Sequence, residues 1–302
     1  MPAEDDGRVR HEVPRVTAPL LVATAWTSAG AASPMAGPAV SPVPITERVA
    51  AVADAGFVGL GLIADDLAVI RESIGFKALR DLIADAGLTH TEIELIERWW
   101  IPRGQPGNSH AVRDLLFEAA DVLHPAFIKI GSEPGPRTPH PEALVEPLRE
   151  LADQAAAHGT RIAIETMPFS IIDTVPFGAE LIRAAGHPVV GLLVDAWHVF
   201  RAGTTLDELA AVAPEKIFGV ELDDAAAHVV GTLFEDTVNN RLLCGEGTFD
   251  LTGLIVTLRS LGFDGPWGVE ILSDSFRALP VHDGLKQAAE SAVSVLRPGN
   301  GA

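Results

Sequence analysis

The sequence contains little cysteine and few cations, and each shortage excludes a class of protein. Its single cysteine, Cys244, rules out a disulfide within the chain, which fits a reducing compartment. Lys and Arg total 22 against 41 Asp and Glu. Nucleic-acid binding requires clustered cations that release the counter-ions of phosphates, so this balance argues against a nucleic-acid partner.

Long apolar runs are also absent. No stretch approaches the roughly 18 uninterrupted apolar residues that cross a bilayer, so no membrane span is expected. The first residues, MPAEDDGRVRHEVPRV, are charged and lack the apolar segment of a secretory signal. We therefore expect a cytoplasmic protein in which residues 1–18 form a flexible lead-in and residues 19–298 form one catalytic domain.

Short apolar runs alternate with longer amphipathic segments along the rest of the chain. In TERVAAVADAG, Thr46 is the expected N-cap of a helix and Gly56 its end, and the next helix is expected over 70–86. Strands are predicted over residues 20–27, 57–64, 89–97, 126–132, 161–168, 189–197, 216–225 and 265–272. Strands separated by helices pair in parallel, and eight such units predict an α/β fold, a (β/α)₈ TIM barrel in a single domain. The alternative is an open doubly wound sheet, but no G-x-G-x-x-G turn follows the first strand.

Four consecutive strands in the second half present a carboxylate at or near their ends. Glu165 ends IAIE, Asp195 ends LLVD, Glu221 lies within FGVELDD, and Glu270 ends WGVE. The active site of such a barrel lies at the C-terminal ends of its strands, so these four side chains should meet there. An ionised carboxylate beside an apolar interior is unfavourable unless it is paired or metal-bound, and the strand-end segments contain few Lys or Arg.

We therefore predict that Glu165, Asp195, Glu221 and Glu270 hold a divalent metal; the alternative is a set of acids that face solvent. An all-oxygen ligand set favours Mn²⁺ or Mg²⁺, with Co²⁺ or Zn²⁺ as the alternatives. Four carboxylates around one dication leave excess negative charge, for which His198, Lys129 and Arg201 are the candidate counter-charges.

The chain after about residue 18 resembles the xylose isomerase-like TIM-barrel superfamily, the sugar phosphate isomerase/epimerase family. The motifs that carry the resemblance are IAIETMP, VDAWHVFRAG, GVELDDA, RLLCGEGTFDL and GVEIL. The resemblance implies that Glu165, Asp195 and Glu270 bind the metal, that Glu165 and Glu270 also form the acid/base pair, and that His198 contacts the substrate. At strand seven the family typically reads V-H-L-K-D and this chain reads VELDD, so Glu221 occupies the position of a histidine ligand.

The activity that this resemblance implies is a metal-dependent isomerase or epimerase acting on a keto-sugar or related polyol through an enediolate. A lyase or dehydratase that performs β-elimination on a keto-glycoside or inosose uses the same enolate and is the first alternative. A barrel subunit without catalysis is a further alternative, because the strand-seven histidine is missing. An endonuclease IV-type repair enzyme is disfavoured, since that family requires several histidines at its strand ends.

Lys129, Trp197, Arg201 and Arg241 are the predicted substrate-binding residues. Lys129 lies in the apolar strand FIKIGS, so its ammonium needs a partner, either a substrate oxygen or a barrel carboxylate. One of Glu92 and Glu94 is expected to face the cavity. The segment LSDSF after strand eight has no Gly-rich phosphate cradle, which favours a small neutral carbohydrate or polyol as the partner. Because relatives in this superfamily are often dimers or tetramers, a homo-oligomer is expected.

Overall fold

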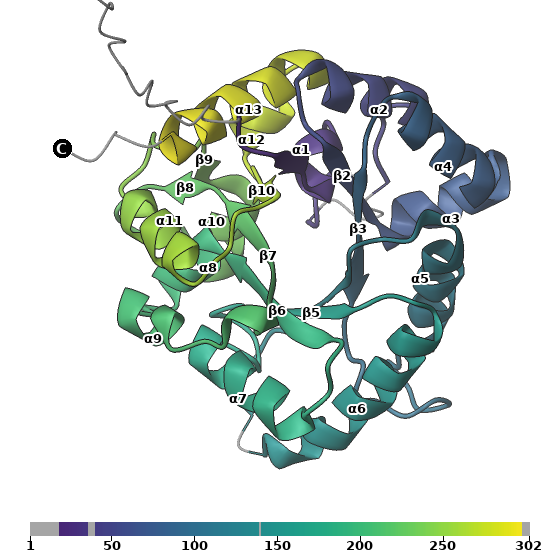
Figure 1. Cartoon of the computed structure of the whole chain (residues 1–302), viewed down its shortest axis with the longest axis vertical. Helices are drawn as coiled ribbons and strands as arrows, with labels where there is room; N and C mark the ends of the chain where they lie inside the picture. Colours follow the sequence, from purple (N-terminus) through teal and green to yellow (C-terminus); the bar gives the residue numbers. More distant parts are fainter. Residues whose placement is uncertain (1–17, 36–39, 139, 298–302) are drawn as a thin grey trace, which may run out of the picture.

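The computed structural model describes residues 18–35, 40–138 and 140–297. Within these residues, eight parallel strands close into a barrel in the order β1-β10-β7-β6-β5-β4-β3-β2 (Figure 1). The strands are β1 (Leu21–Ala23), β2 (Gly59–Ile63), β3 (His90–Ile96), β4 (Ile128–Ile130), β5 (Ile162–Glu165), β6 (Val190–Asp195), β7 (Ile217–Leu222) and β10 (Trp267–Val269). The predicted single-domain (β/α)₈ barrel is confirmed. The lead-in predicted over residues 1–18 lies, except for residue 18, outside the described residues.

Helices form a ring around the barrel, and an apolar core fills the space between the two layers (Figure 1). The outer helices are α2 (Ile45–Asp54), α3 (Ala64–Ser73), α4 (Gly75–Asp85), α5 (His110–Leu123), α6 (Glu142–Ala157), α7 (Val175–Ala185), α9 (Leu206–Ala210), α11 (Leu251–Ser260) and α13 (Val281–Leu296), and the 3₁₀ turn η1 (Pro214–Lys216) precedes β7. Short helices follow three of the strands: α1 (Ala25–Ser28), α8 (Ala196–Arg201) and α12 (Asp274–Arg277).

Two helix expectations need correction. The segment predicted as one helix over 70–86 belongs to two helices, because Gly75, the first residue of α4, adopts a positive φ of 78°, a conformation that interrupts helical geometry. Thr46 is not the N-cap of α2, whose N-cap is Pro44. The helix therefore begins directly after a proline, and Thr46 lies in its first turn.

The barrel interior has an apolar floor beneath a charged layer. Phe127, Ala163 and Leu193 pack together on the inside of the barrel. Gly219 leaves room for them, because a Cβ there would lie 2.7 Å from Leu193 and 2.8 Å from Phe127. Side chains along a strand alternate between its two faces, so the residue two positions after each floor residue points inward again. Those residues are Lys129, Glu165 and Asp195.

An antiparallel hairpin and a short helix extend the chain after β7. β8 (Asp224–Ala225) pairs with β9 (Arg241–Leu242), and α10 (Leu233–Asn239) lies between them. Asp224 holds this extension, since its carboxylate accepts hydrogen bonds from the backbone N–H groups of Gly245 and Phe249, both at 3.0 Å. The hairpin matters because it carries Arg241 to the ends of the barrel strands.

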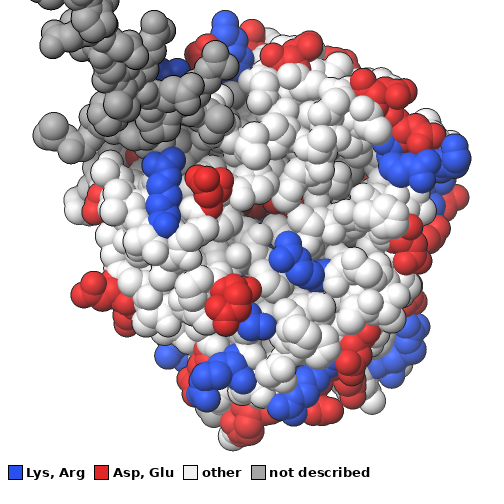
Figure 2. All heavy atoms as spheres, in the orientation of Figure 1, with Lys and Arg blue, Asp and Glu red and all other residues white. Residues whose placement is uncertain are grey.

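The surface shows how charge is distributed around the barrel. On the face in Figure 2, Lys and Arg side chains are scattered among Asp and Glu, and uncharged residues form much of the middle. The acidic balance of the composition is therefore not offset by a continuous basic patch among the described residues of this face. None of the helices in the described part of the chain has the length and apolar character needed to cross a membrane.

Candidate active site and metal centre

Four carboxylates converge at the C-terminal ends of the barrel strands. Glu165 ends β5, Asp195 ends β6, Glu221 lies near the end of β7, and Glu270 directly follows β10. One oxygen from each lies within 4.8 Å of an oxygen from each of the others, and all four residues are buried. Asp195 pairs in register with Glu221. Glu165 pairs with Leu193, two residues before Asp195, and Glu221 pairs with Gly268, two residues before Glu270, so the register steps by two residues at these pairs, as the stagger of a closed barrel requires. The structure thus brings together the four residues that the sequence predicted to meet.

The turn out of β6 places a histidine beside this set. Asp195 is the N-cap of α8, and its Oδ1 accepts a hydrogen bond of 2.8 Å from the backbone N–H of His198. The D-x-x-H spacing is therefore that of an N-cap and its third helical residue. The His198 Nε2 lies 3.5 Å from Glu165 Oε1, whereas its buried Nδ1 has no hydrogen-bond partner among the residues that the structure describes.

Lys129 supplies a cation from inside β4. Its Nζ lies 2.8 Å from Glu221 Oε1, 2.9 Å from Glu94 Oε2 and 3.3 Å from Glu270 Oε1, with Glu165 Oε1 at 3.8 Å. Burial alone would lower the pKa of the Lys129 ammonium, but the surrounding glutamates raise it well above its usual value. Of the two partners expected for Lys129, the structure shows the barrel carboxylates.

Arg241 supplies a second cation from β9. Its Nη1 donates to Asp195 Oδ2 at 2.7 Å and to Asp223 Oδ2, and it lies 3.1 Å from Glu270 Oε2. Thr237 accepts a hydrogen bond from the Nη2 at 2.8 Å and so fixes the guanidinium. The premise that few cations approach the strand-end carboxylates therefore needs correction. Arg241 follows a long connection and Lys129 lies in the first half of the chain, so neither belongs to the acidic strand ends.

Carboxylates still outnumber these cations, and their pKa values reflect it. Burial, and then repulsion from Glu270, raise the pKa of Glu221 well above its usual range. Burial also raises the pKa of Glu270, and burial raises that of Glu94 to about 7. Burial works against the ionised form of Glu165 as well, but Lys129 overcomes it and the pKa falls to about 2. A crowded, buried and oxygen-only set that favours partial protonation fits a hard divalent cation.

A cavity of about 430 Å³ opens above the charged layer. Glu165, Glu270, Lys129 and Arg241 line it together with Glu94 and His198, while Asp195 and Glu221 are not among its lining residues. Apolar walls come from Trp26, Met167, Phe169 and Phe234, and the two phenylalanine rings meet edge to face with centroids 5.6 Å apart. The volume is that of a small-molecule site, with acids at its base and aromatic rings at its side.

Trp197 and Arg201 do not line this cavity. Trp197 Nε1 donates to Asp236 Oδ2 at 3.1 Å, and Arg201 Nε donates to the same oxygen at 3.0 Å. The other Asp236 oxygen accepts the backbone N–H of Val230 at 2.8 Å. Both residues thus lie behind the cavity wall and connect α8 to α10. Direct substrate contact by either one stays a prediction.

Sequence reasoning missed several residues around the site. Asp223 pairs with Arg241, Asp236 anchors Trp197 and Arg201, and Phe169 and Phe234 form the aromatic wall. Asp223 had a signal, because it follows Glu221 by two residues and so continues the same face of β7. Glu94 was one of two acids considered, and it lines the cavity, whereas Glu92 pairs with His90 at 2.8 Å. The aromatic pair had no local signal, because it joins two distant segments.

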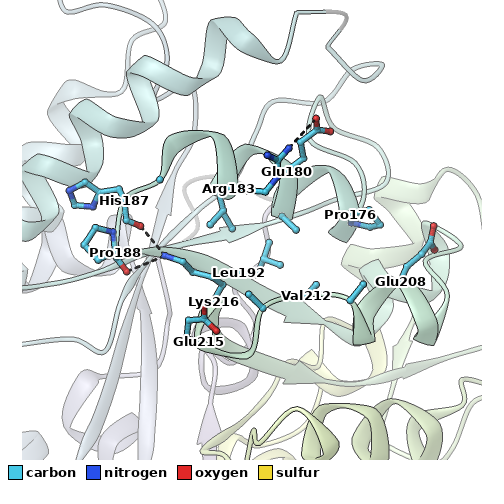
Figure 3. A pocket seen from close by; sticks show the side chains of 15 residues that line it. Pro176, Glu180, Arg183, His187, Pro188, Leu192, Glu208, Val212, Glu215 and Lys216 are labelled. Carbon is cyan, nitrogen blue, oxygen red and sulfur yellow. Dashed lines mark hydrogen bonds and ion pairs between the residues drawn. The ribbon is translucent and has the colours of Figure 1, made fainter.

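A second and larger cavity, of about 740 Å³, lies between α7 and α9 on the outside of the barrel (Figure 3). In Figure 3 the Lys216 ammonium points to the backbone of His187 and Pro188, and Arg183 faces Glu180. Its cations are thus already engaged. Among the described residues, the clusters of metal-ligating side chains all lie at the strand ends instead. The site with the chemistry is therefore the smaller cavity.

Comparison with known proteins gives one family. A sequence model of the family described as xylose isomerase-like TIM barrel matches residues 49–298. The 3-dehydroshikimate dehydratase of Pseudomonas aeruginosa is 29% identical over 252 residues, which are 80% of this chain and 39% of that protein. The inosose isomerase of Bacillus licheniformis is 29% identical over 154 residues, which are 50% of this chain and 54% of the relative. The chain therefore spans less than two thirds of the length of either relative.

A solved structure supports the fold over nearly the whole chain. The crystal structure of the IOLI protein with a bound zinc atom superposes with a TM-score of 0.75 at 19% identity, covering 92% of this chain and 98% of that one. At this identity the likeness is one of fold. The chain is thus related to an isomerase and to a dehydratase, and a protein of the same fold binds a divalent metal.

Proposed function

The chain belongs to the xylose isomerase-like TIM-barrel family, and from that premise we propose that it is a divalent-metal-dependent isomerase or epimerase of a keto-sugar or related polyol. The observation that carries the proposal is the convergence of Glu165, Asp195, Glu221 and Glu270 within 4.8 Å at the strand ends. These four residues would hold the metal. When bound, a dication would polarise the carbonyl of a hydroxy-ketone and favour loss of the neighbouring proton.

Mn²⁺ or Mg²⁺ is the metal we propose, because every ligand is a carboxylate oxygen. Co²⁺ and Zn²⁺ are the alternatives. Zn²⁺ is included because the IOLI protein, which has the same fold, binds a zinc atom. The histidine that related barrels place on strand seven is replaced here by Glu221, which makes the set harder. The identity of the metal therefore has to be measured for this chain and is not taken over from its relatives.

Glu165 and Glu270 form the proposed acid/base pair. Both line the cavity, whereas the other two carboxylates of the set do not. Their environments push their pKa values apart, because the pKa of Glu165 is lowered to about 2 while burial raises that of Glu270. Two carboxyl groups whose pKa values differ in this way can divide the roles of base and acid, one taking a proton from carbon and the other returning one. Placed in this way, a general base contributes roughly 10² to 10⁴ in rate.

The other cavity residues would position the substrate. His198 lines the cavity and is the predicted contact for a substrate hydroxyl group. Lys129 and Arg241 reach the cavity and are the predicted cationic contacts with substrate oxygens. The edge-to-face pair of Phe169 and Phe234 would cover an apolar ring face or substituent and exclude water from the enediolate.

A lyase or dehydratase is the second candidate, and the relationship to a 3-dehydroshikimate dehydratase favours it. The same enolate expels a leaving group from the β-carbon instead of taking back a proton. The charges of the cavity bear on the choice of substrate. Both cations among its described lining residues, Lys129 and Arg241, are already paired with carboxylates. A neutral keto-glycoside or inosose therefore suits the cavity better than a substrate that carries its own carboxylate.

The deciding experiment follows hydrogen exchange in D₂O. Purified protein loaded with Mn²⁺ is incubated with a panel of keto-sugars and inososes, and NMR records deuterium at the carbon beside the carbonyl. We expect exchange that depends on metal and is lost in Glu165→Gln. Exchange with a new epimer or isomer identifies the first candidate, whereas an enone absorbance identifies the lyase. Absence of bound metal after incubation with Mn²⁺, Mg²⁺, Co²⁺ or Zn²⁺ would refute both and leave a barrel subunit without catalysis.

A further inference from the structure

The Lys129 ammonium lies among the carboxylates that the proposed metal needs. Its Nζ is within salt-bridge distance of both oxygens of Glu221, at 2.8 Å and 3.1 Å. Glu270 Oε1 lies 3.3 Å and Glu165 Oε1 3.8 Å from the same atom. Three of the four proposed ligands therefore share their oxygens with a cation that the chain itself supplies.

The position of this ammonium is set by the fold. Lys129 is the middle residue of β4, its side chain is 2% exposed, and Phe127 lies two residues earlier in the apolar floor. Glu94 on β3 gives the ammonium one further contact, at 2.9 Å, and it is not one of the four proposed ligands. Glu94 thus offers a place for the ammonium when the other oxygens are taken.

A dication and this ammonium would compete for the same oxygens. They also repel each other, and repulsion between buried charges is weakly screened by solvent. Metal-to-oxygen distances of roughly 2.0–2.6 Å are shorter than the Lys129 contacts, so binding would draw the shared carboxylates away from the ammonium.

Building on the function proposed above, we propose that Lys129 is a built-in competitor of the metal. In the metal-free protein it holds the carboxylate set together, and on metal binding it retreats toward Glu94. Lys129 therefore lowers the affinity of the site for the metal and raises the stability of the metal-free protein. This role differs from the substrate contact predicted from the sequence.

The test measures Mn²⁺ affinity by isothermal titration calorimetry in the wild type, in Lys129→Met and in the double variant Lys129→Met/Glu94→Gln. The double variant removes one charge of each sign and leaves all four proposed ligands in place. We expect both variants to bind Mn²⁺ at least about tenfold more tightly than the wild type. We also expect metal-free Lys129→Met to unfold at a lower temperature than the wild type, and Mn²⁺ to raise its unfolding temperature by a larger amount.

A lysine at the opposite end of the strands provides the control. Lys216 precedes β7, and its Nζ donates to the backbone carbonyls of His187 at 2.9 Å and Val190 at 3.2 Å. Lys216→Met removes the same side chain without touching a carboxylate of the site. Its Mn²⁺ affinity should equal that of the wild type.

The outcomes separate this inference from the function on which it rests. Metal binding by the wild type and tighter binding by both variants support the two together. A wild type without binding beside variants that bind would support Lys129 as the occupant and overturn the metal-dependent function. Variants that bind no more tightly than a metal-binding wild type overturn the inference alone, and no binding in any of the proteins overturns both. If Lys129→Met does not fold, the charge-compensated double variant decides.

Discussion

Two buried charge clusters in this barrel differ in their balance. On one side, Arg48 pairs with Asp66 beside α1 and α3. The Arg48 Nε donates to Ser28 Oγ and its Nη2 to the carbonyl of Ala25, both at 2.7 Å. The second Asp66 oxygen accepts the backbone N–H of Ser41 at 2.8 Å. Each charge therefore has one opposite charge and enough hydrogen bonds, and the cluster fastens loops to the barrel.

The cluster at the strand ends is not balanced. Lys129 and Arg241 face a larger number of carboxyl groups, namely Glu94, Glu165, Asp195, Glu221, Asp223 and Glu270. Burial and mutual repulsion raise the pKa of Glu221, Asp223 and Glu270. Such an arrangement opposes stability, which is expected where a cluster serves to bind a cation or move a proton. The balance of charge therefore distinguishes the structural cluster of Arg48 and Asp66 from the candidate active site at the strand ends.

The largest effect is expected when the unbalanced cluster loses its reacting groups. Glu270→Gln and Glu165→Gln should each lower metal-dependent deuterium exchange by roughly 10² to 10⁴, because each removes one member of the acid/base pair. Exchange is measured by NMR at saturating Mn²⁺. Urea unfolding of the metal-free variants is the companion measurement. Glu270→Gln should show no loss of stability, because it neutralises a carboxylate whose pKa is raised in the fold, whereas Glu165→Gln should lower stability, because the lowered pKa of Glu165 means that its ionised form is favoured there. Variants that keep wild-type exchange would remove these residues from the reaction.

The balanced cluster should respond in the opposite way. Asp66→Ala leaves Arg48 buried without its partner, and breaking a buried pair costs about 3–5 kcal/mol of unfolding free energy. Urea denaturation measures this loss, while calorimetry should find the Mn²⁺ affinity of the folded protein unchanged. A loss of only about 1 kcal/mol of unfolding free energy is what an exposed ion pair contributes. That result would show that the Arg48–Asp66 pair does not hold the loops to the barrel.

The sequence was sufficient for the part of the site that strand geometry dictates. Parallel strands of a barrel end at one edge, so an acid at the end of four consecutive strands had to converge on its neighbours. The positions of Glu165, Asp195 and Glu270 could therefore be predicted without knowing the conformation of any loop. Glu221 followed from the same argument, although it departs from the residue typical of related barrels.

The counter-charges could not be predicted because they depend on contacts between distant segments. Arg241 is separated from Asp195 by 46 residues, and the connection is shaped by the hydrogen bonds of Asp224 and Asp236. Trp197 lies next to the site in sequence but turns toward Asp236, because α8 begins at the end of β6. Local patterns give no information on which distant partner a side chain will meet.

Metal removal should affect only the unbalanced cluster. At a Mn²⁺ concentration of about 100 Kd, binding stabilises the native state by about 2.7 kcal/mol, and a chelator should abolish that gain. Thermal unfolding with and without chelator measures the shift. Asp66→Ala should show the same metal-dependent gain as the wild type, because neither Arg48 nor Asp66 makes an ion pair or hydrogen bond with the four proposed ligands among the described residues, and sites without shared partners contribute additively. A smaller gain in that variant would mean that the two clusters are coupled.

Asp236 tests whether balance, rather than closeness to the site, decides the role of a buried acid. It does not line the cavity but lies behind the residues that do. Its two oxygens accept hydrogen bonds from Trp197, Arg201 and the backbone of Val230. By its partners it belongs with Asp66. Asp236→Asn should therefore lower the unfolding free energy by about 1.5 kcal/mol, the scale of a hydrogen bond to a charged group, and leave Mn²⁺ affinity unchanged. Weaker Mn²⁺ binding at unchanged stability would contradict this expectation. It would mean that closeness to the site decides the role of a buried acid more than the number of its partners does. The contacts of Asp236 that join α8 to α10 would then affect the metal-binding carboxylates through Asp195, the N-cap of α8.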